Sequence, residues 1–292
     1  MALFFKKILP KKLQKTTTTI PVVKLTGAII ANNSQLRPGL NLTSCAEQLQ
    51  KAFERKNSPA VAIIINSPGG SPVQSRLIYQ RIRDLSSEYN KIVHVFVEDV
   101  AASGGYMIAC AGHDITSDPS SIVGSIGVIS ATFGFEEAID KIGIRRRIYS
   151  AGKNKSMLDP FLPEKKQDIA RLRKLQLEIH DIFINLVKES RGDRLIDTNN
   201  EQLFTGFFWT GLQGKDLGLV DAIGDIRGSI RSRYGETAKL KFIEPKKSLF
   251  GRRSMISMSG VLGIGSEKII AQAADGFLSA LEEKALWSRL GL

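Results

Sequence analysis

The sequence contains very little cysteine. Cys45 and Cys110 are the only two among 292 residues, and neither lies in a Cys-x-x-Cys motif or a cysteine–histidine cluster. Two cysteines cannot supply a disulfide framework, and their positions do not match the ligand spacing of a structural zinc site. The chain must therefore be held together by an ordinary hydrophobic core, which its length allows.

Long apolar runs are also missing. No stretch approaches the roughly 18 uninterrupted apolar residues of a membrane-spanning helix. The opening, MALFFKKILPKKLQK, has lysine pairs where a secretory signal has its apolar region. These absences predict neither a transmembrane helix nor a cleaved leader. They favour a location in the cytoplasm or peripherally on the inner (cytoplasmic) membrane.

Acidic residues are absent from the first part of the chain. Glu47 is the first of them, it follows seven basic residues, and the whole chain carries a formal net charge of +12. No aromatic stacking platform or nucleic-acid-binding motif accompanies the basic residues, so we expect no nucleic-acid partner. The basic N-terminal arm is either simply solvated or attracted to an anionic membrane surface.

Short β-rich runs alternate with helical stretches in the first third of the chain. Strands are predicted at 20–25, 60–66 and 92–98, with a crossover helix within 71–89. The second strand, AVAIIIN, is apolar and β-branched, so both of its faces should be covered, as in a parallel sheet between helix layers. The pattern predicts an α/β fold built from βαβ units.

Further along, the sequence predicts a helix at 135–143, a strand at 145–150 and a long packed helix over 163–191. The composition then shifts to Gly, Ser and Met and to an amphipathic pattern near the end of the chain. We therefore divide the chain into a basic N-terminal arm at 1–19, an α/β domain at 20–245, and a basic and amphipathic C-terminal tail at 246–292.

The first candidate site is the segment NSPGGSP at 66–72, where a buried strand ends and a helix begins. Glycine permits positive φ, so Gly69 and Gly70 can present backbone N–H groups that no Cβ shields. Such groups bind anions or the oxyanion of an acyl-transfer reaction. A tight turn without any ligand is the simpler interpretation. The spacing fits neither a Walker loop nor a dinucleotide site.

The second candidate is Ser103, which follows another predicted strand and is surrounded by alanine and glycine. Small neighbours let a substrate backbone approach the hydroxyl, which would suit a nucleophile at the start of a helix. Serine is also a preferred N-cap, so a purely structural role remains open.

A nucleophilic serine needs a base, and none of the three histidines is well placed. His94 lies within a predicted strand, His180 on the long helix, and His113 in a turn. Lys153 and Lys155 are the alternative, in a loop after residue 150. A lysine acts as a base near neutral pH only where burial lowers the side-chain pKa from about 10.4 to about 7–8. Both lysines could instead be solvated loop residues.

Four motifs occur in order: NSPGG at 66–70, ASGGY at 102–106, VGSIGVI at 123–129 and GKNKS at 152–156. Together they resemble the signal peptide peptidase A family of serine peptidases, over roughly residues 20–244. The resemblance implies an α/β ClpP/crotonase-like spiral fold with a long packed helix. It also implies that a Ser-Lys dyad replaces the Ser-His-Asp triad.

The resemblance also assigns roles to single residues. It places the nucleophile at Ser103 and the general base at Lys155, with Lys153 the weaker candidate. The hydroxyl of Ser125 would help to hold the lysine. Backbone N–H groups for the oxyanion would come from Gly104 and from either Gly69 or Gly70.

By the same resemblance, the substrates would be signal-peptide remnants or other unfolded apolar peptides, and no metal or cofactor would be needed. Short members form homo-oligomeric rings in which the lysine of one protomer completes the site of the next. Two alternatives stay open. A crotonase-type acyl-CoA hydratase or lyase would need a Glu or Asp pair instead of Ser103, and an inactive membrane-associated scaffold would keep only the fold.

Overall fold

The computed structural model describes residues 17–31, 39–196, 201–244 and 284–292. Most of the predicted N-terminal arm, and residues 245–283 with most of the predicted C-terminal tail, lie outside these ranges. Among the described residues, no helix is both long and apolar enough to span a lipid bilayer.

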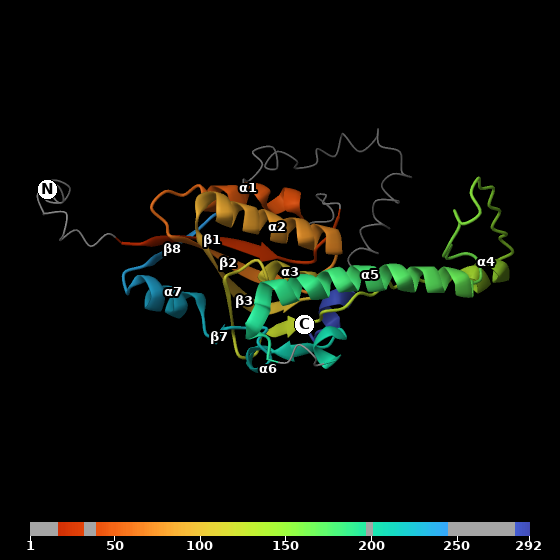
Figure 1. Ribbon diagram of the computed structural model, residues 1–292. Coiled ribbons are helices and arrows are strands. Elements are labelled where there is room, and N and C mark those ends of the chain that lie inside the picture. Colours follow the sequence, from red (N-terminus) through yellow and green to blue (C-terminus); the bar gives the residue numbers. More distant parts are fainter. Residues whose placement is uncertain (1–16, 32–38, 197–200, 245–283) are drawn as a thin grey trace, which may run out of the picture.

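One mainly parallel sheet forms the centre of the molecule, in the order β6-β5-β3-β2-β1-β8, with β4 paired to β3 and β7 (Figure 1). Among the strand pairs of the described residues, only β5–β6 is antiparallel. The strands are β1 (Thr19–Thr26), β2 (Ala60–Ser67), β3 (Ile92–Ala102), β4 (Asp114–Ser117), β5 (Ile122–Gly124), β6 (Phe208–Thr210), β7 (Ala222–Ile223) and β8 (Lys239–Phe242). The three strands predicted from the first third of the sequence are confirmed as β1, β2 and β3.

Helices cover both faces of this sheet. The described helices are α1 (Leu42–Phe53), α2 (Pro72–Tyr89), α3 (Gly104–Ala109), α4 (Glu136–Lys141), α5 (Lys166–Arg191), α6 (Gly211–Asp216) and α7 (Ile226–Tyr234), of which α4 lies away from the sheet. The main apolar core lies between the sheet and α1, α2 and α3, and a smaller one lies under α7 (Figure 1). Nearly every side chain of β2 is buried, as its β-branched run predicts.

β3 changes partner along its length, and this change positions the candidate site. Residues His94 to Val97 pair with β4, whereas Val100 to Ala102 pair with β5. β2 and β3 run parallel, so the segments that follow them emerge at the same edge of the sheet. The glycine turn after β2 and Ser103 after β3 therefore meet there.

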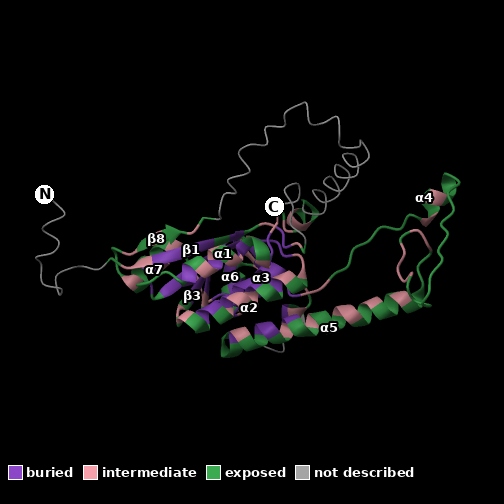
Figure 2. Cartoon of the chain, turned by 90° about the horizontal axis from the view of Figure 1, so that it is seen from above, coloured by how far each residue is buried: buried purple, intermediate pink, exposed green. Residues whose placement is uncertain are grey.

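Part of the chain extends away from the sheet. Residues 130–165, which include α4, extend from the sheet domain to the N-terminal end of α5, and we call them the projecting arm (Figures 1 and 2). The long packed helix predicted over 163–191 is only partly correct, because α5 buries Phe183, Leu186, Val187 and Arg191 near its C-terminal end, while no residue of its first half is buried. The strand predicted at 145–150 is wrong, since this segment has no strand partner among the described residues.

A buried polar network docks α7 on the sheet. His94 Nδ1 lies 2.7 Å from Asp114 Oδ2, and its Nε2 lies 2.7 Å from the Tyr234 hydroxyl. Arg233 Nη1 donates to the same Asp114 oxygen at 2.6 Å. Burial alone would raise the pKa of the Asp114 carboxyl, but the hydrogen bonds from His94 and Arg233 hold that pKa below its usual value.

This lowered pKa predicts a loss of stability in acid. A depressed folded-state pKa stabilises the fold above the unfolded value of about 3.9, and the contribution disappears as pH falls through the folded pKa. We expect Asp114→Asn to lower the free energy of unfolding by about 1.5–3 kcal/mol at pH 7, the usual value of hydrogen bonds to a charged group. Urea melts should show this difference shrinking below about pH 4. Asp140→Asn, at an exposed site on α4, is the control, and a pH-independent difference for Asp114→Asn would contradict the prediction.

Candidate active site

The glycine turn after β2 packs directly against Ser103. A Cβ added to Gly69 would lie 2.7 Å from Ser103 Cβ and 2.9 Å from the Gly104 nitrogen, so only glycine fits at this position. Ser67 fixes the turn, because its Oγ donates to the Gly27 carbonyl at 2.7 Å and accepts from the Gly69 N–H at 3.3 Å. The two segments that the sequence singled out therefore form one site.

Two backbone N–H groups at this site remain without partners. Neither Gly70 nor Gly104 donates its N–H to any residue that the structure describes. The neighbouring bonds run from Ile29 N–H to the Gly69 carbonyl and from Ser71 N–H to the Ile29 carbonyl, both at 2.8 Å. The Gly69 N–H is already donated to Ser67, so Gly70 and Gly104 are the donors left for a ligand.

Ser103 has an unusual backbone conformation. Its φ is +52° and its ψ is −121°, a combination that a non-glycine residue rarely adopts and that costs free energy. The Ser103 N–H donates to the Gly124 carbonyl at 2.8 Å, which helps to hold it there. Although Ser103 occupies the N-cap position of α3, its side chain makes no capping hydrogen bond. The simple capping interpretation is therefore wrong.

Ser103 and Ser125 line the same cleft. The cleft has a volume of about 370 Å³, and Gly70, Val128 and Ile129 also contribute to its walls. Ser125 has a φ of +53° and donates its N–H to the Phe207 carbonyl at 2.7 Å. The structure thus brings together the nucleophile, second-serine and glycine candidates at one place.

A small apolar hollow of about 20 Å³ adjoins Ser103. Its apolar lining comes from Met107 of α3, Val128, and Ile179 and Phe183 of α5. Sequence reasoning missed this pocket, since these residues are distant in the chain and their apolar character signals only a core. It is suited to a small apolar side chain.

The histidines do not belong to this site. His94 is held in the network under α7, His113 Nδ1 accepts from the Val93 N–H at 3.0 Å, and His180 Nε2 lies 3.0 Å from the Ile126 carbonyl. None of them lines the cleft, and neither does any described aspartate or glutamate. The one ionisable side chain along the described wall is Arg289.

The lysine candidates lie elsewhere. Lys153 and Lys155 are exposed in the projecting arm, and neither lines the cleft with Ser103. The arm is held at the far end of α5 from the sheet (Figures 1 and 2). Within a single copy, the structure does not bring Lys155 to Ser103.

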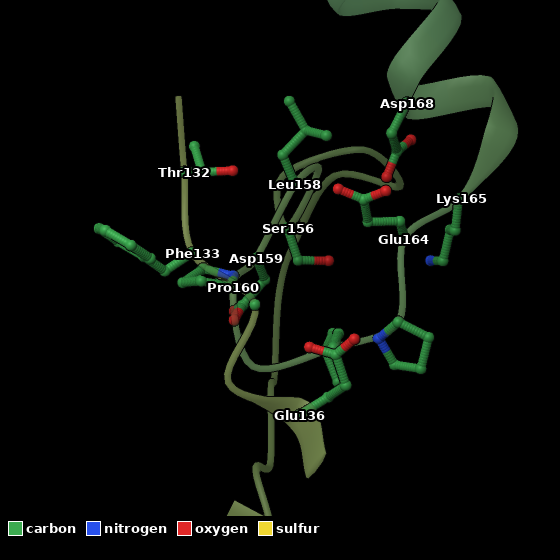
Figure 3. Close-up of a pocket in the computed structure, with 13 residues that line it drawn as sticks. Thr132, Phe133, Glu136, Ser156, Leu158, Asp159, Pro160, Glu164, Lys165 and Asp168 are labelled. Atoms are coloured by element: carbon green, nitrogen blue, oxygen red, sulfur yellow. The ribbon is translucent and has the colours of Figure 1, made fainter. Parts of the chain in front are cut away.

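The arm contains a hollow of its own, shown in Figure 3. Its lining includes the carboxylates of Glu136, Asp159, Glu164 and Asp168. The Asp159 carboxylate accepts the Phe161 N–H at 3.0 Å and pairs with Arg146 at 3.1 Å, so it folds the loop. No group of three or more described His, Cys, Asp or Glu side chains is placed to hold a metal ion.

Ser103 has a strained backbone and lies beside two unpaired N–H groups, where the carboxyl ends of β2 and β3 meet. This is the arrangement of a serine-type peptidase. Residues 86–240 match the family model described as Peptidase family S49, and the chain belongs to this family. Family membership confirms the resemblance inferred from the four motifs, and the mainly parallel sheet covered by helices confirms the α/β fold.

Several curated proteins resemble this chain. A protein of Brucella abortus (strain 2308) named "Na(+)/H(+) antiporter NhaA" is 55% identical over 98% of this chain, but the match spans 39% of that protein. "Protease 4" of Haemophilus influenzae is 34% identical over 76% of this chain and 36% of its own length. "Serine protease SPPA, chloroplastic" of Arabidopsis thaliana is 31% identical over 63% of this chain and 27% of its own. This chain thus spans well under half of the length of these relatives.

Among solved structures, a mutant of the "1510-N membrane-bound stomatin-specific protease" aligns with 79% of this chain and 99% of its own. The TM-score is 0.47 and the sequence identity 17%.

Proposed function

We propose that the chain is an endopeptidase in which Ser103 is the nucleophile and Lys155 of a second copy is the general base. Neutral Lys155 would take the proton from Ser103 Oγ as that oxygen attacks the carbonyl carbon of the substrate. The protonated lysine would then give the proton to the leaving amine. Water would hydrolyse the acyl-enzyme with the same lysine as base. The conformation of Ser103, which serves no cap, is the observation that carries this proposal.

The oxyanion would be bound by the backbone N–H groups of Gly70 and Gly104. Both are unpaired within the described chain, and both residues line the hollow beside Ser103. Prepositioned donors of this kind stabilise the charge that develops in the transition state. Of the two candidates in the turn, Gly70 is favoured over Gly69, whose N–H is already engaged by Ser67.

A second copy would also cover the apolar surface of the projecting arm. Phe133, Ile142 and Tyr149 are 73%, 70% and 92% exposed, and further apolar side chains are exposed on the first half of α5. Apolar exposure of this extent is typical of an interface between subunits. A homo-oligomeric ring would bury this surface and bring each Lys155 into the cleft of a neighbour, where it would lose the solvent that surrounds it in one copy.

The substrates would be unfolded apolar peptides, including remnants of signal peptides. The small hollow beside Ser103 is lined by Met107, Val128, Ile179 and Phe183 and would accept a small apolar side chain of such a peptide. The open cleft in front of it would hold the extended backbone. Ser125, on the wall of the same cleft, would orient the incoming lysine.

The cleft gives less support to the alternatives. A crotonase-type hydratase or lyase needs a carboxylate pair at the reacting carbon, and no described Asp or Glu lines the cleft. A scaffold without activity would not require a glycine turn that keeps two N–H groups free.

A fluorophosphonate probe tests the nucleophile. We expect the full chain to form a covalent adduct, which mass spectrometry of proteolytic fragments should locate on Ser103. Ser125→Ala should remain reactive, whereas Ser103→Ala should not. An adduct on another serine, or none under conditions that label a known serine peptidase, would refute the proposed nucleophile.

A further inference from the structure

The C-terminal segment of the chain forms part of the wall of the candidate active-site cleft. Residues 284–288 form a short helix, and the chain then turns, with N–H groups of Leu290 and Leu292 donating to the Trp287 carbonyl. Leu286, Arg289 and Leu290 line the same cleft as Ser103 and Ser125. In Figure 1 this end of the chain lies against the sheet domain.

The sequence of this segment explains why it packs beside the cleft. Leu286 and Leu290 are four residues apart and lie on one side of a helical turn, where both are partly buried. Lys284, Ala285 and Ser288 are exposed instead. The segment therefore presents an apolar side to the wall formed by Val128 and Ile129. Much of the Ile129 side chain is still exposed to solvent.

We infer that residues 284–292 act as an internal inhibitor of the peptidase site. The inference rests on the proposed function, because it assigns regulation to the same cleft. A peptidase cuts substrates in an extended conformation, whereas this segment borders the cleft as a helical turn. It would exclude a substrate from Ser103 without presenting a cleavable bond.

The inhibitor belongs to the same chain as the site, so its local concentration does not fall on dilution. A peptide substrate must displace it, and the observed rate is reduced by the fraction of molecules whose cleft is occupied. Apolar substrates that bind well would open the site, whereas weakly bound peptides would not. The segment thus restricts cleavage to the class of peptide that the cleft prefers.

The test compares rates of fluorophosphonate labelling at Ser103 in four forms of the full protein: unmodified, lacking residues 284–292, Leu290→Asp and Ala285→Asp. We expect the truncation and Leu290→Asp to label roughly tenfold faster, within the usual range of coupling between sites. Ala285→Asp adds the same charge at an exposed position that does not line the cleft, so it should label like the unmodified chain. Equal rates in all four forms would overturn the inference.

A second measurement does not depend on catalysis. Amide hydrogen exchange at Ser125, Gly127 and Val128 should be slower in the unmodified chain than in the truncation, because the segment closes one side of the cleft that these residues line. Failure to label Ser103 in any form would refute the proposed nucleophile, whereas unchanged exchange would refute the occupied cleft.

Addition of the segment as a separate peptide completes the test. The peptide KALWSRLGL should slow labelling of the truncated chain, and the same peptide with aspartate in place of Leu290 should not. Equal effects of the two peptides would contradict recognition through the leucines.

Discussion

Ser103→Ala and Lys155→Ala should each lower kcat/KM for an apolar peptide by roughly 10⁴-fold or more, because nucleophile and base act as one unit. If the lysine comes from a second copy, a mixed assembly of the two inactive variants regains activity. A site is then complete wherever a copy with intact Ser103 meets a neighbour with intact Lys155. Random mixing in equal amounts should restore roughly a quarter of the unmodified activity.

The controls for this complementation lie in the same loop and cleft. Lys153→Ala should retain most of the peptidase activity of the unmodified chain. Mixing Ser103→Ala with the unmodified chain should give no more activity than the unmodified chain has by itself. No recovery in assemblies shown to contain both variants would place the lysine in the same copy as the serine. Full activity of Lys155→Ala together with an inactive Lys153→Ala would move the base to Lys153.

Gly69→Ala should lower kcat by about 10²–10³-fold with little change in KM, the effect of losing an oxyanion donor. The added methyl group would lie 2.7 Å from Ser103 Cβ and 2.9 Å from the Gly104 nitrogen, so serine and donor cannot both keep their positions. The loss should appear in the transition state, because the substrate carbonyl is bound less tightly than the oxyanion that forms from it.

Gly27→Ala is a matched control for this substitution. Gly27 and Gly69 have the same φ of +99°, but a Cβ at Gly27 meets nothing within 4 Å. Both variants should therefore lose about 1 kcal/mol or more of stability from the strained backbone. Only Gly69→Ala should lose activity at a temperature where thermal melts show both to be folded. Equal loss of kcat in the two variants would assign the effect to backbone strain.

The sequence alone determined the features that depend on local physics. The β-branched run of β2 predicts a strand buried on both faces, and the alternation of strands with helices predicts a parallel sheet. The glycine pair after β2 and the small residues around Ser103 signal close backbone approach, since each needs space or a positive φ within a few residues. Residues that are adjacent in the sequence meet these requirements, so the sequence alone is enough to predict these features.

Only the tertiary structure decided which groups meet across long separations. It engages the Gly69 N–H with Ser67 and leaves that of Gly70 free, and it leaves Ser103 without a capping bond. It also places Lys155 away from the cleft of its own copy, and Leu290 on the wall of that cleft. The reason is physical, because the direction in which α5 carries the arm depends on packing of its C-terminal end against the core. Nothing in the local sequence of the arm or the tail records that direction.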